Sequence, residues 1–235
     1  MTTFAITTLG CKVNAYESQG YAQHLIDMGM EEVDFKECAD IYIINTCAVT
    51  NTAAAKSRQK IHQAQRQNKN AMIVVVGCYA QSSAEQLSKD ASIDLVIGSD
   101  QKELLPLLIK EQLKQQGPRV LVNDISHMSV FEALPVRRFA HQTRAYLKIQ
   151  DGCNQFCTYC IIPYARGRER SLAPDEVIQR TKELVCNHHL EIVLTGIHTG
   201  RYGREHHIDL TQLLERMCHE VTGLARIRIS SIEIN

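Results

Sequence analysis

The chain has 235 residues, of which 44% are hydrophobic and 22% charged, and its 26 basic residues are balanced by 26 acidic ones. This balance excludes a globally basic nucleic-acid binder, although it leaves room for a local basic patch. No apolar run approaches the roughly 20 residues of a membrane span, and the first residues lack the basic and apolar segments of a secretory signal.

Nine cysteines are present in a chain without an export signal. Disulfides are rare in reducing compartments, where an excess of cysteine indicates metal binding or catalysis. We therefore expect a cytoplasmic protein that has no membrane partner and uses some of its thiols as ligands.

Short β-branched or apolar runs alternate with helical patterns along the first part of the chain. Strands are predicted at 4–9, 41–45, 72–76 and 94–97, and helices at 15–28, at 51–67 and after Lys102. Such alternation is typical of an α/β domain with an open, mostly parallel sheet. We expect this domain over residues 1–116 and a linker over 117–143.

The alternation resumes beyond the expected linker. Strands are predicted at 145–150, 191–197 and 226–232, and helices at 174–186 and 210–218. Three strand–helix repeats without a closing element predict the first half of a partial (β/α) barrel over residues 144–235. A small three-stranded α/β layer is the alternative.

Three cysteines lie within eight residues directly after the predicted strand 145–150: Cys153, Cys157 and Cys160. Thiolates are the usual ligands of iron–sulfur clusters, and three ligands on a four-iron cluster leave one iron open to a substrate or cofactor. A structural zinc site would need a fourth ligand, and the residues immediately downstream offer no Cys or His. Inert buried cysteines are an alternative for one or two of the three.

A second triad is spread over the first domain. Cys11, Cys47 and Cys78 each follow the end of a predicted parallel strand. Open α/β sheets gather their functional loops at the carboxyl edge of the strands, so we expect these thiols to converge there. Three ligands again imply a cluster with one open iron, while a buried small hydrophobic residue is the alternative for each.

Other features carry less specific signals. Residues 137–170 hold seven Lys and Arg against two Asp and Glu, which suits either a phosphate backbone or a solvated surface. Cys38, Cys186 and Cys218 have no partner at a useful spacing, and we expect them to be packing residues.

The C-x3-C-x2-C spacing resembles the motif of radical S-adenosylmethionine (SAM) enzymes. The segments TLGCKVNAYES, NTCAVTNTAAAKSRQKI, VVVGCYAQ and DGCNQFCTYCIIPYARGRERS together resemble the methylthiotransferase family within that superfamily. KVN after Cys11, AVTNT after Cys47 and LTGIHTGRYG at 194–203 are most similar to the tRNA branch that acts on N6-threonylcarbamoyladenosine 37.

The resemblance implies an α/β domain with an auxiliary [4Fe-4S] cluster on Cys11, Cys47 and Cys78, followed by a radical SAM barrel. Cys153, Cys157 and Cys160 would hold the second, catalytic [4Fe-4S] cluster. SAM would supply both the methyl group and the radical that takes hydrogen from adenine C2. Thr195, Gly196 and Glu233 would bind the cofactor, and tRNA, an electron donor and a sulfur donor would be the partners.

Family members are roughly twice as long as this chain, so the resemblance implies that the second half of the barrel and the C-terminal RNA-binding TRAM domain are missing here. Activity of the chain by itself is therefore in doubt. Alternatives within the family are isopentenyladenosine 37 or a ribosomal-protein aspartate as the substrate. Outside the family, the alternatives are a non-catalytic iron–sulfur redox protein and a zinc-stabilised interaction module. Electron carriers usually complete four-cysteine ligation, which favours the enzyme.

Overall fold

A computed structural model describes residues 1–115, 117–134, 136–137, 139, 143–230 and 232. Its first part is a six-stranded parallel sheet in the order β2-β1-β3-β4-β5-β6. The strands are β1 (Thr3–Thr8), β2 (Glu31–Glu32), β3 (Ile41–Thr46), β4 (Met72–Gly77), β5 (Leu95–Ile97) and β6 (Arg119–Leu121). The predicted α/β class and parallel sheet are confirmed.

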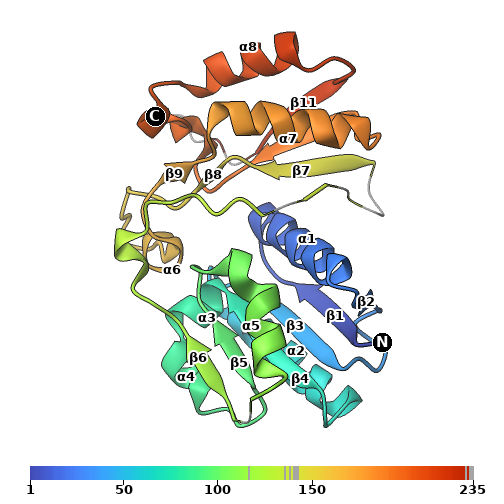
Figure 1. Ribbon diagram of the computed structural model, residues 1–235. Helices are drawn as coiled ribbons and strands as arrows, with labels where there is room; N and C mark the ends of the chain where they lie inside the picture. Colours follow the sequence, from blue (N-terminus) through green and yellow to red (C-terminus); the bar gives the residue numbers. More distant parts are fainter. Residues whose placement is uncertain (116, 135, 138, 140–142, 231, 233–235) are drawn as a thin grey trace.

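Helices cover both faces of this sheet (Figure 1). They are α1 (Lys12–Asp27), α2 (Asn51–Gln67), α3 (Cys78–Ser82), α4 (Ala84–Ser88) and α5 (Leu105–Gln112), with short 3-10 turns η1 (Lys102–Leu104) and η2 (Ile125–His127). Strand alternation explains the layering, because Ile41 and Ile43 of β3 pack toward α1 and α5 while Tyr42 and Ile44 pack toward α2. Such a strand is buried on both sides, which is why it reads as a continuous apolar run.

The second part is a three-stranded parallel sheet in the order β11-β10-β7. Its elements are β7 (Arg144–Lys148), β8 (Gln150–Asp151), α6 (Ile162–Arg166), β9 (Arg170–Ser171), α7 (Pro174–Cys186), β10 (Glu191–Thr195), η3 (Thr199–Arg201), η4 (Arg204–His206), α8 (Leu210–Glu220) and β11 (Arg226–Ile229). Strands β8 and β9 form a separate antiparallel pair that frames the Cys153–Cys160 loop.

The two parts are packed together rather than merely connected. Helix α1 contacts both β1 below it and β7 above it, and it lies between the two sheets (Figure 1). A single hydrophobic cluster runs from Phe4 of β1 to Leu147 of β7. The junction between the two parts is therefore interior.

The segment expected as a linker contributes to this packing. It contains β6, which pairs with β5, and it buries Leu134, Val136 and Phe139. Gly20 of α1 is required here, because a Cβ on it would come within 2.7 Å of the Leu134 Cβ. These three residues of the segment are thus part of the core.

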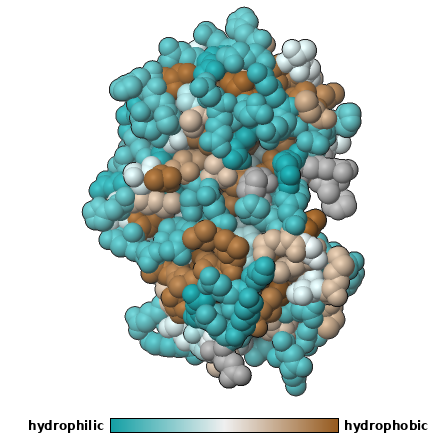
Figure 2. Space-filling model, in the orientation of Figure 1, coloured by the Kyte–Doolittle hydropathy of each residue, from teal (hydrophilic) through white to brown (hydrophobic). Residues whose placement is uncertain are grey.

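Apolar side chains are exposed on the side of the first sheet that α5 covers. Leu104, Leu107 and Leu113 are each about half exposed, and apolar surface gathers over this helix (Figure 2). Among the described residues, no helix combines the length and apolar character that crossing a membrane requires.

Candidate functional site

The first cysteine triad lies at the carboxyl edge of three adjacent strands, β1, β3 and β4. Cys11 is the N-cap residue of α1, Cys47 directly follows β3, and Cys78 is the first residue of α3. Cys47 and Cys78 are buried and Cys11 is exposed. A Cβ on Gly10 would lie 2.9 Å from the Cys47 Sγ, so the loops that carry Cys11 and Cys47 approach as closely as glycine permits.

Polar side chains fix these loops. The Asn14 amide donates to the carbonyls of Leu9 (2.7 Å) and Thr46 (3.0 Å), and so joins the ends of β1 and β3. The Cys11 thiol in turn donates to the Asn14 Oδ1 at 3.7 Å. Thr46 Oγ1 donates to the Val76 carbonyl at 2.7 Å, which joins β3 to β4. The three cysteine loops therefore form one rigid edge.

The second triad lies on the loop between β8 and α6. Cys153, Cys157 and Cys160 line a cavity of about 160 Å³ together with Ile197 and His198, which follow β10. The loop is folded tightly, because Gly152 has a φ of +69° and a Cβ on it would lie 1.9 Å from the Arg168 carbonyl oxygen.

Gln150 joins this loop to the end of β10. Its side chain donates to the carbonyls of Asp151 (3.0 Å) and Gly152 (2.9 Å) and accepts the backbone N–H groups of Ile197 (2.9 Å) and His198 (2.7 Å). The cavity between them is therefore held on both sides by one fully buried side chain.

Thr195 and Gly196, two of the residues expected to bind the cofactor, lie beside this cavity but are not among the residues that line it. The Thr195 Oγ1 accepts from the Ser230 Oγ at 3.2 Å, and Gly196 packs against Gln150. The next two residues, Ile197 and His198, line the cavity instead. Glu233 lies outside the described residues.

His198 is a site residue that the sequence prediction missed. It is 3% exposed, and neither of its ring nitrogens has a hydrogen-bond partner in the part of the chain that the structure describes. Buried polar groups are almost always hydrogen-bonded, so a buried imidazole with two unpaired nitrogens beside three thiols needs an explanation. The only sequence signal was its place directly after the predicted strand 191–197.

The basic stretch 137–170 is only partly a surface. Lys148, Arg166 and Arg170 are buried and meet the carboxylates of Glu17 and Asp151 at the junction of the two parts. The alternatives of a phosphate-binding patch and a solvated face are therefore both wrong for these three cations. Burial of a charge requires paired partners, and Glu17 lies 131 positions from Lys148 and 149 from Arg166, where no local pattern reveals it.

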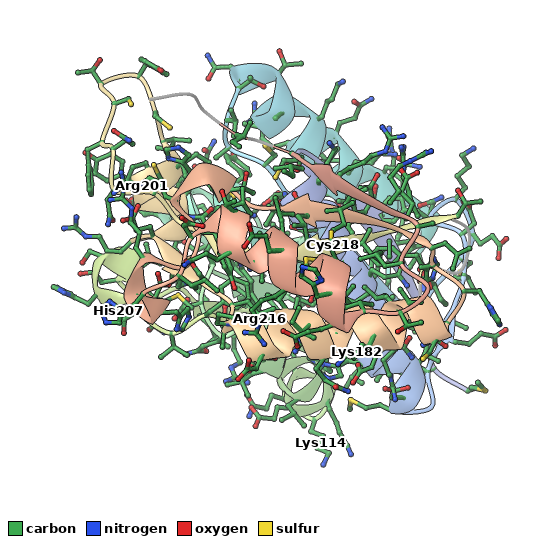
Figure 3. The ribbon with its side chains drawn as sticks, turned by 90° about the horizontal axis from the view of Figure 1, so that it is seen from above. Lys114, Lys182, Arg201, His207, Arg216 and Cys218 are labelled. Carbon is green, nitrogen blue, oxygen red and sulfur yellow. The ribbon has the colours of Figure 1, made fainter. Side chains whose placement is uncertain are left out.

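The three remaining cysteines correct another expectation. Cys38, Cys186 and Cys218 are all exposed rather than packed, and Cys218 lies on α8 in Figure 3. Cys186 and Cys218 are on helix positions outside the apolar stripes, where a small hydrophobic residue is tolerated without burial.

The spacing of the thiols bears on the kind of metal centre that they could hold. Among the described residues, no three His, Cys, Asp or Glu side chains are grouped as ligands of one metal ion. Each thiolate of a four-iron cluster binds a different iron, so its ligands stand further apart than those of a mononuclear site. Burial raises the pKa of Cys153, and the hydrogen bond that its Sγ accepts from the Gln155 N–H partly offsets that effect.

Two family descriptions match successive parts of the chain. Residues 3–98 match "Uncharacterized protein family UPF0004" and residues 147–235 match "Radical SAM superfamily". The first match contains Cys11, Cys47 and Cys78, and the second contains the Cys153–Cys160 loop. Each triad therefore falls in its own matched region.

Curated relatives match nearly the whole chain. The chain is 47% identical over 234 residues to the threonylcarbamoyladenosine tRNA methylthiotransferase MtaB of Bacillus subtilis. The aligned region covers 99% of this chain and 52% of the relative. It is 37% identical to the protein of the same name from Aquifex aeolicus (98% and 56%) and 40% identical to the tRNA-2-methylthio-N(6)-dimethylallyladenosine synthase of Moorella thermoacetica (96% and 52%).

Over nearly its whole length the chain is similar to radical SAM methylthiotransferases. Its resemblance to that family, expected from the motifs, is confirmed. The radical SAM superfamily implies SAM and a [4Fe-4S] cluster as cofactors. The chain spans about half the length of these relatives.

Proposed function

We propose that the chain forms the cluster-bearing half of a tRNA methylthiotransferase that modifies C2 of N6-threonylcarbamoyladenosine 37. The observation that carries the proposal is the pair of cysteine triads. One lies at the carboxyl edge of the first sheet and the other on the loop after β8, and both lie beside one buried junction. A non-catalytic redox protein is less well supported, because each triad is one ligand short of the usual four. Electron and sulfur donors are proposed as further partners.

Specific residues would perform separate tasks. Cys153, Cys157 and Cys160 would hold the catalytic cluster and leave one iron open, and Cys11, Cys47 and Cys78 would hold the auxiliary cluster. When bound, SAM and the two clusters supply the radical, the methyl group and the sulfur. Gln150 fixes the strand end of Thr195 and Gly196 against the cysteine loop. His198 presents two unpaired ring nitrogens at the cavity, where they can hydrogen-bond the group held at the open iron.

The expected domains remain part of the proposal. We assign residues 1–116 and β6 to the auxiliary-cluster domain, because β6 completes its sheet. Residues 144–235 would form the first half of the radical SAM barrel, with the rest of 117–143 connecting the two. Glu233 is proposed as a cofactor ligand on the family resemblance alone.

The choice of tRNA branch rests on the relatives and on the segment 194–203. The Bacillus subtilis relative, named for threonylcarbamoyladenosine, is 47% identical, whereas the Moorella thermoacetica relative, named for dimethylallyladenosine, is 40% identical. Both nucleosides carry a substituent on adenine N6, so the reaction at C2 would be the same and only recognition would differ.

The test uses the protein in its full natural length, reconstituted without oxygen and incubated with SAM, dithionite and anticodon stem-loop RNAs. The RNAs carry N6-threonylcarbamoyl, N6-isopentenyl or unmodified adenosine 37. We expect 5′-deoxyadenosine and a methylthio group, detected by mass spectrometry, with the first RNA only. Methylthiolation of the isopentenyl RNA instead would overturn the choice of branch.

Two cysteine variants separate the sites in the same assay. Cys153→Ala should abolish cleavage of SAM while the auxiliary cluster remains. Cys47→Ala should do the reverse, sparing cleavage but stopping sulfur insertion. A folded single variant that lost the spectra of both clusters would refute the two-site assignment.

A further inference from the structure

A buried ion cluster fills the junction between the two cysteine sites. Glu17 of α1 accepts from Lys102 (2.7 Å), from Lys148 (3.1 Å) and from Arg166 (3.1 Å). Asp151, at the end of β8, accepts from the same Lys148 (2.8 Å) and Arg166 (3.0 Å). All five side chains are at most 1% exposed. The cluster therefore belongs to the interior and joins residues from both parts of the chain.

Cations outnumber carboxylates in this cluster. Arg170 is a fourth cation, bound to Asp151 at 3.2 Å, so four cationic side chains meet two carboxylates. Glu132 adds a third carboxylate at the edge, where its Oε1 accepts the Lys102 backbone N–H. Burial lowers the pKa of Lys102, whereas Asp151 and Glu17 outweigh burial at Lys148 and raise its pKa. Unpaired buried charge is strongly unfavourable, so a further anion nearby would stabilise the surplus cation.

Arg166 extends from this cluster to the first cysteine site. Its Nη2 donates to the Asn14 Oδ1 at 2.5 Å, the same oxygen that accepts the Cys11 thiol. Its helix α6 packs against α3, which begins at Cys78. Its Nε is buried and has no partner among the described residues. Burial alone would lower the pKa of Arg166, but the neighbouring Cys78 sulfur and the carboxylates of Glu17 and Asp151 outweigh it and raise that pKa.

Arg166 also closes the second cysteine loop. Asp151 lies two residues before Cys153 and Arg166 lies six residues after Cys160, and their ion pair joins the two ends of the loop. The Cys153 N–H donates to the Gly167 carbonyl at 3.1 Å next to this pair. One guanidinium thus contacts the base of the Cys153–Cys160 loop on one side and the N-terminus of α1 on the other.

We propose that Arg166 is a positioning residue shared by both cysteine sites: its guanidinium holds the Cys153–Cys160 loop against the N-terminus of α1, and its charge balances the anionic cluster on Cys11, Cys47 and Cys78. This inference rests on the proposed two-cluster function. A planar fork suits the task, because it can donate to Asn14, Glu17 and Asp151 at once, whereas a lysine ammonium is a point charge.

The experiment compares Arg166→Gln and Arg166→Lys with the control Arg170→Gln. Arg170 is equally buried and bound to Asp151, but its other side-chain contacts are the carbonyls of Arg166 and Arg168. Each variant is made in the Cys153→Ala background, where only the first triad can hold a cluster. The midpoint potential of that cluster is measured by an EPR-monitored redox titration.

Arg166→Gln should shift the potential to more negative values, because a nearby positive charge favours the reduced, more anionic cluster. Arg166→Lys and Arg170→Gln should leave it near that of the parent. If Arg166→Gln folds and keeps the parent potential, or if Arg170→Gln shifts it equally, the charge-balancing role is wrong.

The positioning role has its own readout. With all six cysteines present, Arg166→Lys should retain less iron on the Cys153–Cys160 loop than the wild type, because an ammonium cannot span the three acceptors. Full iron and sulfide at both triads would overturn that role, and this result can be obtained even if Arg166→Gln fails to fold. A wild-type chain that assembles a cluster at only one triad would instead refute the proposed function itself, and this proposal with it.

Discussion

Glu17→Gln tests how much the buried ion cluster at the junction contributes to the stability of the fold. Glu17 is fully buried and its carboxylate accepts from three cations that come from η1, β7 and α6. The substitution keeps the shape of the side chain but removes the negative charge, so it leaves Lys102, Lys148 and Arg166 with Asp151 as their main counter-charge. Breaking a buried ion pair in this way costs about 3–5 kcal/mol, and we expect a loss of that size in the free energy of unfolding.

The assay is urea unfolding of the iron-free, reduced chain, followed by circular dichroism. Glu85→Gln is the matched control, because Glu85 forms an exposed pair with Lys89 at 2.8 Å, and such pairs contribute about 0–1 kcal/mol. The control is expected to lose less than about 1 kcal/mol of its free energy of unfolding. An equally small loss in Glu17→Gln would show that the junction is not the buried, charged cluster described above.

Acid dependence provides a second measure of the same carboxylate. Burial alone would raise the pKa of Glu17, but Arg166, Lys102 and Lys148 outweigh it and hold that pKa well below its ordinary value of 4.5. The unfolded chain therefore binds protons that the folded chain does not, and the stability from Glu17 is present above pH 4.5 and is lost as the pH falls toward the lowered pKa. Glu17→Gln should flatten the decline of stability below about pH 4.5, and an unchanged decline would count against this account.

Two further substitutions probe the cysteine sites. Gly10→Ala should lose iron from the first triad, because its Cβ would lie 2.9 Å from the Cys47 Sγ; Gly29→Ala, at a similar positive φ with no atom within 4 Å of its Cβ, should keep that iron. Equal iron in both variants would contradict the proposed packing of the loops. His198→Phe should stabilise the cluster-free chain by about 1 kcal/mol in thermal unfolding, because it removes two unpaired buried nitrogens. The same variant should bind SAM more weakly in the cluster-loaded chain, as measured by EPR. A destabilised cluster-free chain would mean that the imidazole is satisfied within the fold.

Local sequence patterns were sufficient for most elements of the fold. The helices predicted at 51–67 and 174–186 have those bounds in the structure, because Thr50 caps the first by accepting the Ala53 N–H and Pro174 begins the second. The helix predicted from residue 15 begins at Lys12 instead. Its N-cap is Cys11, which makes no side-chain capping bond and so gave no start signal.

The places of the two cysteine triads in the fold could be predicted because each thiol comes at or shortly after a strand end or lies in a short spaced motif. The ion cluster between them could not. Glu17 pairs with residues 85, 131 and 149 positions away, and nothing in its neighbours distinguishes it from a solvated helix position. His198 was missed for a related reason, since its importance lies in the absence of a partner, which only the three-dimensional surroundings reveal.

The central claim, two clusters on two triads, is tested most directly by counting metal and sulfide. The wild-type chain is purified and reconstituted without oxygen, and its iron, acid-labile sulfide and zinc are measured. We expect about eight irons and eight sulfides per chain, and about half of each in Cys47→Ala and in Cys153→Ala. Zinc without sulfide in the wild-type chain would contradict the account.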